Sequence, residues 1–154
     1  MKKEVSVDKP FTKALIPIDG SRYSMQTAEY GIKLAKAYGM EILAFYVIDE
    51  TSVESLTHLS KEEPHMLQQN LRREGENCLN YLAELAADEG VKLETRIRTG
   101  TPHQAIVETA RAENVDLIII GKVGQRGPRR ILIGSVTERV IESARCPVLV
   151  VRQG

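Results

Sequence analysis

The chain has 154 residues and carries 21 acidic and 21 basic side chains, so its formal net charge is zero. This length suits one domain with a sizeable core, and the balanced charge provides no global field that attracts nucleic acid or an anionic membrane. The start of the chain lacks the apolar stretch of a signal peptide, and no apolar run is long enough to span a bilayer. We therefore expect a cytoplasmic protein with neither nucleic acid nor a membrane as partner.

Cysteines and histidines give no sign of a metal site. The two cysteines, Cys78 and Cys146, stand in no CxxC pair, and the three histidines are scattered along the chain. Structural zinc is therefore disfavoured, and two thiols do not make the disulfide scaffold of a small secreted protein. A single disulfide between them stays open at this point.

The first apolar run follows a polar start. Residues 1–11 are interpreted as an N-terminal tail, which leaves 12–154 as one domain. The run at 14–18 is typical of a buried parallel strand. Pro17 lies inside it and cannot donate a ladder hydrogen bond, so strand pairing is expected to lapse there.

The next segments continue the alternation of strand and helix. Ser21 suits the N-cap of a helix over 22–38, which Gly39 ends. A second strand is predicted over 41–49. The polar connection at 50–63 has no clear type, and a lid over a ligand and a plain disordered loop are both open.

The rest of the chain completes a βαβ rhythm. Residues 91–100 alternate apolar and polar side chains, which indicates a half-solvated strand at a sheet edge. This alternation of elements predicts an α/β fold, a single open sheet of five parallel strands with helices on both faces. Ligands of such sheets bind beyond the carboxyl ends of the strands. The remaining elements are expected at 65–89 (helix), 91–100 (strand), 102–113 (helix), 115–120 (strand), 135–144 (helix) and 147–151 (strand).

A glycine-containing segment carries the clearest chemical signal. Gly121 and Gly124 follow an apolar strand and allow close approach of a ligand to the backbone. Gly134 and Ser135 open a helix, where free N–H groups and the helix dipole favour phosphate. The spacing is neither that of a Walker A loop nor GxGxxG. These rules alone leave phosphate binding and a purely structural loop about equally open.

This glycine spacing resembles the ATP-binding signature of the universal stress protein family. The segments at 13–21, 43–50, 100–121 and 144–152 also resemble that family, in the same order. The likeness covers nearly the whole chain apart from the tail and the 50–63 connection. It implies a Rossmann-like sheet with the strand order 3-2-1-4-5.

The resemblance also implies a role for individual residues. Asp19 is expected near the ribose and phosphates, while Pro17 and Val47 border the adenine. Magnesium or manganese commonly accompanies such a nucleotide, held mainly by phosphate oxygens and water. The full expected nucleotide-binding set is Pro17, Asp19, Val47, Ile120, Gly121, Gly124, Gly134, Ser135 and Val136, with Lys122, Arg126 and Arg130 as candidate phosphate contacts. Lys122, Val123 and Pro128 depart from the family's usual loop.

The sequence predicts a regulatory protein that binds ATP or another adenine nucleotide, with little or no hydrolysis. Hydrolysis requires an oriented water, and Asp19 is the only candidate base near the expected cleft, so we name no catalytic residue. One alternative is an interaction module of the same fold that holds no nucleotide. A nucleotide-dependent transferase is a second, for which we find no motif. The family's habit of pairing through the last strand, Pro147 to Val151, predicts a homodimer.

Overall fold

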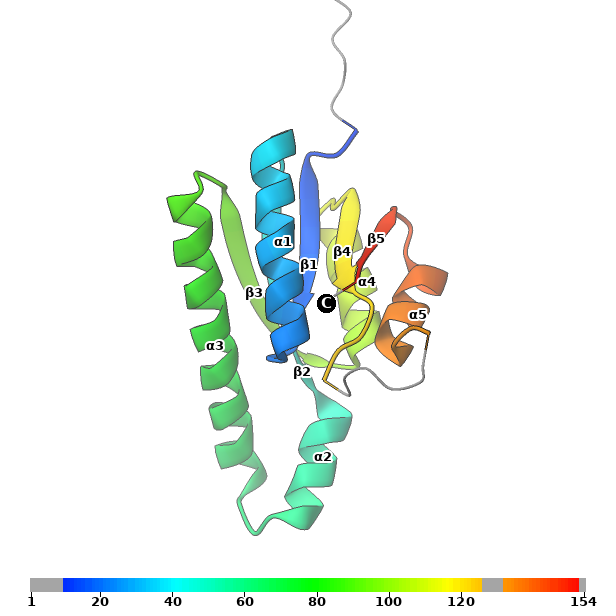
Figure 1. The fold of residues 1–154 in the computed structure, drawn as a ribbon. Helices are drawn as coiled ribbons and strands as arrows, with labels where there is room; N and C mark the ends of the chain where they lie inside the picture. The colour runs from blue at the N-terminus through cyan, green and yellow to red at the C-terminus, as the bar shows by residue number, and fades with distance from the viewer. Residues whose placement is uncertain (1–9, 126–131, 153–154) are drawn as a thin grey trace, which may run out of the picture.

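Parallel strands pair into one five-stranded open sheet with the order β3-β2-β1-β4-β5 (Figure 1). The computed structural model describes residues 10–125 and 132–152. The α/β class and the strand order expected from the sequence are confirmed. In chain order the elements are β1 (Lys13–Ile18), α1 (Arg22–Tyr38), β2 (Glu41–Asp49), α2 (Glu50–Leu59), α3 (Pro64–Asp88), β3 (Leu93–Gly100), α4 (Pro102–Ala112), β4 (Leu117–Gly121), α5 (Ser135–Ser143) and β5 (Val148–Val151).

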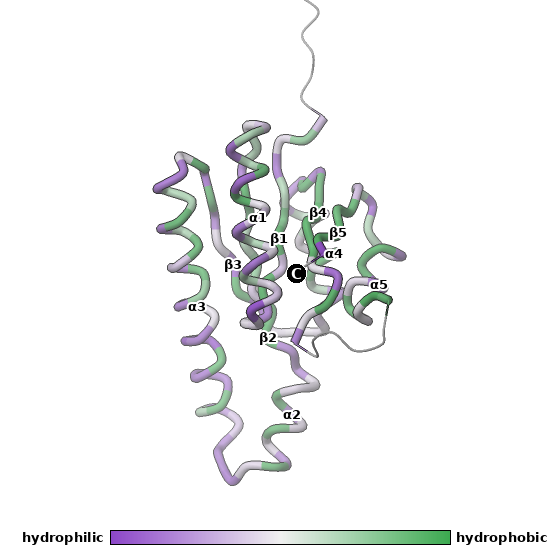
Figure 2. The backbone as a smooth tube through the Cα atoms, viewed as in Figure 1, coloured by the Kyte–Doolittle hydropathy of each residue, from purple (hydrophilic) through white to green (hydrophobic). Residues whose placement is uncertain are grey.

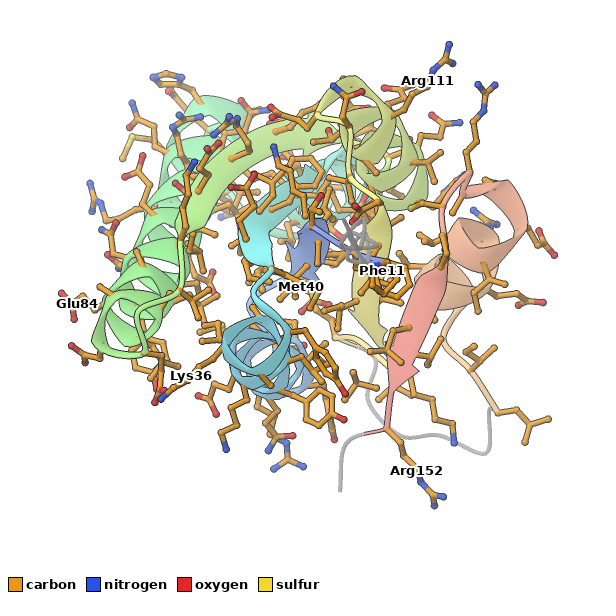
Figure 3. The ribbon with its side chains drawn as sticks, turned by 90° about the horizontal axis from the view of Figure 1, so that it is seen from above. Phe11, Lys36, Met40, Glu84, Arg111 and Arg152 are labelled. Atoms are coloured by element: carbon orange, nitrogen blue, oxygen red, sulfur yellow. The ribbon has the colours of Figure 1, made fainter. Side chains whose placement is uncertain are left out.

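Helices cover both faces of the sheet and divide the core in two. Even-numbered residues of β1 and β2, such as Ile16 and Ala44, pack with residues of α1 and α3. Odd-numbered residues, such as Leu15 and Phe45, pack with residues of α4 and α5. Figure 3 shows these layers from above, with Lys36 of α1 and Arg111 of α4 on opposite sides of the sheet. Figure 2 shows the apolar character of β4 along the backbone tube.

Local signals at the ends of α1 act as the sequence predicts. The Ser21 side chain accepts a hydrogen bond from the Ser24 amide, and Gly39 ends the helix with a φ of 69°. In β1, pairing with β2 runs along the whole strand, whereas pairing with β4 is confined to Ala14 and Leu15. Pro17 therefore lies where the β1–β4 ladder has already opened, as its missing N–H requires.

The connection after β2 is a helix, which its composition did not reveal. Asp49 caps α2 by accepting from the Thr51 amide at 3.0 Å. Only Val53 of this helix is buried, so the apolar periodicity that marks a packed helix is weak. Together with the first turns of α3, it projects beyond the carboxyl ends of the strands (Figure 1).

Two further observations bear on the chemistry of the chain. Cys78 and Cys146 are both free thiols, so the disulfide left open by the sequence is not formed. No helix within residues 10–125 and 132–152 is both long and apolar enough to cross a lipid bilayer.

Candidate functional site

Asp19 stands at the carboxyl tip of β1 and is tightly held there. Its Oδ1 accepts from the Ser21 amide at 2.9 Å and from the Ser21 hydroxyl at 2.6 Å. Its own amide donates to the Ser24 hydroxyl at 3.3 Å. This Asx-type turn links β1 to the start of α1, so the carboxylate is fixed by the first strand-to-helix junction.

The loop that follows β4 folds against this carboxylate. A Cβ atom placed on Gly124 would lie 2.7 Å from Asp19 Oδ2. The next residue, Gln125, donates its amide to the same oxygen at 3.1 Å. Only glycine allows the backbone to approach this closely, which is the physical reason for the glycine that the sequence singled out.

The start of α5 closes onto the same loop. The Gly134 amide donates to the Lys122 carbonyl at 2.8 Å, and a Cβ on Gly134 would lie 3.3 Å from that oxygen. The buried Thr137 hydroxyl donates to the Gly121 carbonyl at 2.7 Å. These bonds gather Gly121, Gly124 and Gly134 into one small region beyond the strand ends.

Backbone donors are the chemical resource of this region. Ser135 and Val136 occupy the first turn of α5, where backbone amides precede the intrahelical hydrogen bonds. The N-cap is Gly134, which has no side chain that could cap them. Amides of this kind, at the positive end of the helix dipole, favour an anion such as phosphate.

An apolar surface lies beside these donors. Val47 and Ile120 belong to the cluster on the α4 and α5 side of the sheet and are 9% and 6% exposed. Pro17 is half-buried and, by strand alternation from Leu15, faces the same side. An apolar floor next to a cluster of amides suits a flat ring joined to a phosphate chain.

The structure thus brings together most of the residues that the sequence put forward. Lys122 is half-buried, and Ser135 and Val136 are exposed at the helix start. Arg126 and Arg130, the expected phosphate contacts, lie outside the described residues. The sequence did not indicate Gln125, whose bonds to Asp19 span 106 positions of the chain. Thr137, the hydroxyl one turn into the helix that follows Gly134, donates to the Gly121 carbonyl.

A separate buried cluster lies on the opposite face. The Tyr46 ring is 3% exposed, and burial, with the nearby Glu74 carboxylate adding to it, raises the pKa of its hydroxyl to about 12. A Cβ on Gly75 would lie 2.6 Å from this ring. The phenol therefore stays neutral at physiological pH and serves to pack α3 against β2.

A hollow away from the carboxyl ends of the strands does not add a second site. A hollow of about 360 Å³ at the amino ends of the strands is bordered by Thr12, Met40 and Val91. The charges beside it pair with one another, as Lys36 does with Glu89 at 2.7 Å. Within the described part of the chain, no three His, Cys, Asp or Glu side chains gather as metal ligands would.

The strand order and the glycine-containing segment at 121–125, here called the glycine loop, define an α/β protein of the Rossmann-like type. The model of the Universal stress protein family matches residues 10–152. The curated universal stress protein MJ0531 of Methanocaldococcus jannaschii is 39% identical over 143 residues, which cover 93% of this chain and 83% of that protein. The chain therefore belongs to the universal stress protein family.

Solved structures agree with this assignment. The structure of MJ0577, also from Methanocaldococcus jannaschii, superposes with a TM-score of 0.79 at 33% identity and covers 94% of this chain and 97% of that one. A universal stress protein in complex with cAMP superposes with a TM-score of 0.64 at 21% identity, covering 92% and 97%. An identity this low supports the fold alone.

Proposed function

We propose that this protein binds an adenine nucleotide such as ATP at the carboxyl ends of β1, β2 and β4 and acts as a regulator in the cytoplasm. The observation that carries the proposal is the convergence of Gly124, Gly134 and the first turn of α5 beside an apolar floor. The solved relative that holds cAMP has the same fold. Its ligand supports the choice of an adenine nucleotide without fixing the number of phosphates.

The two halves of the ligand would meet different surfaces. Pro17, Val47 and Ile120 provide apolar contact for the adenine ring. The amides of Gly124, Ser135 and Val136 provide donors for the phosphates, with the Lys122 ammonium group as an additional charge. Since this recognition uses mainly backbone groups, it tolerates changes of side chain around the loop.

A divalent cation would enter with the nucleotide. The Asp19 carboxylate is the acidic group beside the glycine loop, and both its oxygens already accept hydrogen bonds from Ser21 and Gln125. Magnesium or manganese would therefore be held by phosphate oxygens and water, which suits a hard cation of this kind. The residues fit a nucleotide-borne metal.

The same bonds support low intrinsic hydrolysis. A general base needs a free acceptor within hydrogen-bond reach of the attacking water. Asp19 already accepts two hydrogen bonds on Oδ1 and one on Oδ2, so few of its acceptor positions remain for an attacking water. A single-turnover assay should show ATP intact over the lifetime of the complex. Rapid hydrolysis that Asp19→Asn abolishes would contradict this part of the proposal.

Mass spectrometry of small molecules released from the purified protein tests binding directly. We expect an adenine nucleotide to co-purify or, after its removal, to rebind with a measurable dissociation constant by calorimetry. Protein that is folded by circular dichroism and binds neither ATP, ADP, AMP nor cAMP at millimolar concentration would instead support the interaction module without nucleotide.

Gly124→Ala tests whether the loop is part of the site. The new Cβ would displace the Asp19 carboxylate, so we expect affinity for the nucleotide to fall at least about tenfold, the effect of roughly 1.4 kcal/mol. Gly100→Ala is the matched control, because its Cβ would lie at an ordinary 3.9 Å from that of Ala105. Equal nucleotide affinity in the two variants would show that the loop is not part of the site.

We further propose a homodimer formed through β5. Leu149 of this edge strand is 38% exposed, and Val136 and Ile141 of the neighbouring α5 are 36% and 45% exposed. Pairing β5 with its copy would satisfy the outward backbone groups and cover these side chains. A monomer at micromolar concentration in light scattering would contradict the dimer.

A further inference from the structure

Gln125 is joined to Asp19 at two points. Its backbone amide donates to Asp19 Oδ2 at 3.1 Å, and its side-chain Nε2 donates to the Asp19 carbonyl at 2.5 Å. Gln125 thus binds both the side chain and the backbone of Asp19. Such a two-point attachment fixes orientation as well as distance.

The partner of Gln125 is itself rigid. Asp19 is bound to Ser21 through Oδ1 and to Ser24 through its amide. Ser21 in turn caps α1. Gln125 therefore attaches the loop to the short β1–α1 turn, which is held between the end of β1 and the start of α1.

The position of Gln125 directly after Gly124 explains what its bonds to Asp19 do. The root of the loop is held by the Gly134–Lys122 and Thr137–Gly121 bonds. Gly124 lies beyond these bonds, and Gln125 is the next residue. The bonds to Asp19 therefore fix Gly124 from its other side, so its amide is aimed before a ligand arrives.

We propose that Gln125 is a positioning residue for the nucleotide site. The Gln125 side chain holds residues 121–125 against Asp19 at the end of β1 and thereby slows release of the bound nucleotide. This inference rests on the proposed function and adds to it the group that sets the residence time. Loops preordered in this way bind more tightly because less conformational entropy is lost on binding. Differences in affinity of this origin mostly change the dissociation rate.

Gln125→Met removes the side-chain donor, keeps the length of the side chain and leaves the backbone amide in place. We expect the release rate of a fluorescent ATP analogue, measured by stopped flow, to rise about fivefold, the factor for one lost hydrogen bond of ordinary strength. The association rate should change by less than about twofold. Gln26→Met, at an exposed position of α1, is the matched control and should change neither.

Hydrogen exchange in the protein without nucleotide provides a second, independent readout. The amide of Gln125, which donates to Asp19 Oδ2, should exchange about fivefold faster in Gln125→Met than in the parent, and the thermal midpoint should fall by no more than the few degrees that one such bond accounts for. A purely structural contribution would lower the midpoint in the same way but leave the release and association rate constants of the nucleotide unchanged.

The outcomes separate this inference from the function on which it rests. Faster exchange together with faster release supports the positioning role. Unchanged exchange overturns it, even if release is faster, because Gln125 would then act by touching the nucleotide itself. Should the parent bind no adenine nucleotide, the proposed function fails. The exchange comparison then still decides whether Gln125 holds the loop.

Discussion

The two edge strands of the sheet, β3 and β5, differ in the side chains that flank their exposed backbone. On β3, charged side chains alternate with uncharged ones and are tied down by ion pairs. Arg98 binds Glu108 of α4 at 2.7 Å, and Arg96 binds both Glu94 and Glu113 at 3.1 Å. Charge along an edge discourages another strand from pairing with it. The β3 edge is therefore closed to a partner.

The β5 edge has no such protection among the described residues. Its sequence is VLVV, and Leu149 lies half-exposed. The carbonyls of Pro147 and Val151 accept from the amides of Ile118 in β4 and of Lys122, which follows β4. By the alternation of a parallel ladder, the backbone groups of Val148 and Val150 therefore point outward. An apolar edge with free donors and acceptors suits a second strand.

The difference teaches where this fold can assemble. Both edges border a buried apolar cluster, and both strands pair in parallel with their inner neighbours. Charged side chains on β3 and their absence from β5 are therefore the difference on which the proposed dimer depends. The proposed dimer is the consequence at β5, and three variants test the comparison.

Leu149→Lys should have the largest effect. Near a twofold axis it places an ammonium group of each protomer in the apolar contact, and like charges there cost several kcal/mol. We expect the dimer dissociation constant, measured by analytical ultracentrifugation, to rise by about 100-fold or more. Thr99→Lys on β3 is the control and should leave it unchanged. Equal association in both variants would show that β5 is not the interface.

The double substitution Arg96→Val and Arg98→Val should have an intermediate effect. It gives β3 an apolar face like that of β5 and removes its ion pairs with Glu94, Glu113 and Glu108. We expect species larger than the dimer in size-exclusion chromatography, because both edges would then accept strands. A variant that elutes like its parent at every concentration would show that charge is not what protects β3.

Arg96→Ala should have the smallest effect. The Arg96 side chain is 43% exposed, and exposed ion pairs contribute little because water and salt screen them. We expect urea unfolding to show a loss of about 0.5 kcal/mol, reduced further at high salt. A loss several times larger would mean that these pairs hold β3 in place, so that the edge is protected by structure and not by charge.

Much of this architecture follows from short-range patterns. The half-solvated alternation at 91–100 predicts an edge strand, and β3 is one. Pro17 predicts a lapse in pairing, which occurs on the β4 side of β1. These predictions succeed because the burial of a strand on one face or both sets the pattern of apolar and polar residues along it. The missing N–H of a proline is likewise visible in the sequence itself.

The helix α2 and the contacts of the site escape such patterns. α2 buries only Val53, so it carries little of the periodicity by which helices are recognised. The glycine spacing and a family resemblance singled out the segments that carry these contacts. Neither predicted that Asp19 would accept from Gln125, since the sequence contains no signal for a bond between an aspartate and a distant glutamine.

By itself, then, the sequence determined the order of the elements other than α2, the two edges and the position of the glycine loop. Each depends on the apolar pattern, the caps and the backbone limits of residues close together in the chain. Only the tertiary structure decided that Gln125 meets Asp19, 106 positions away, and that Thr137 meets Gly121, 16 positions away. Such contacts form only when parallel pairing brings the carboxyl ends of β1 and β4 to the same end of the sheet.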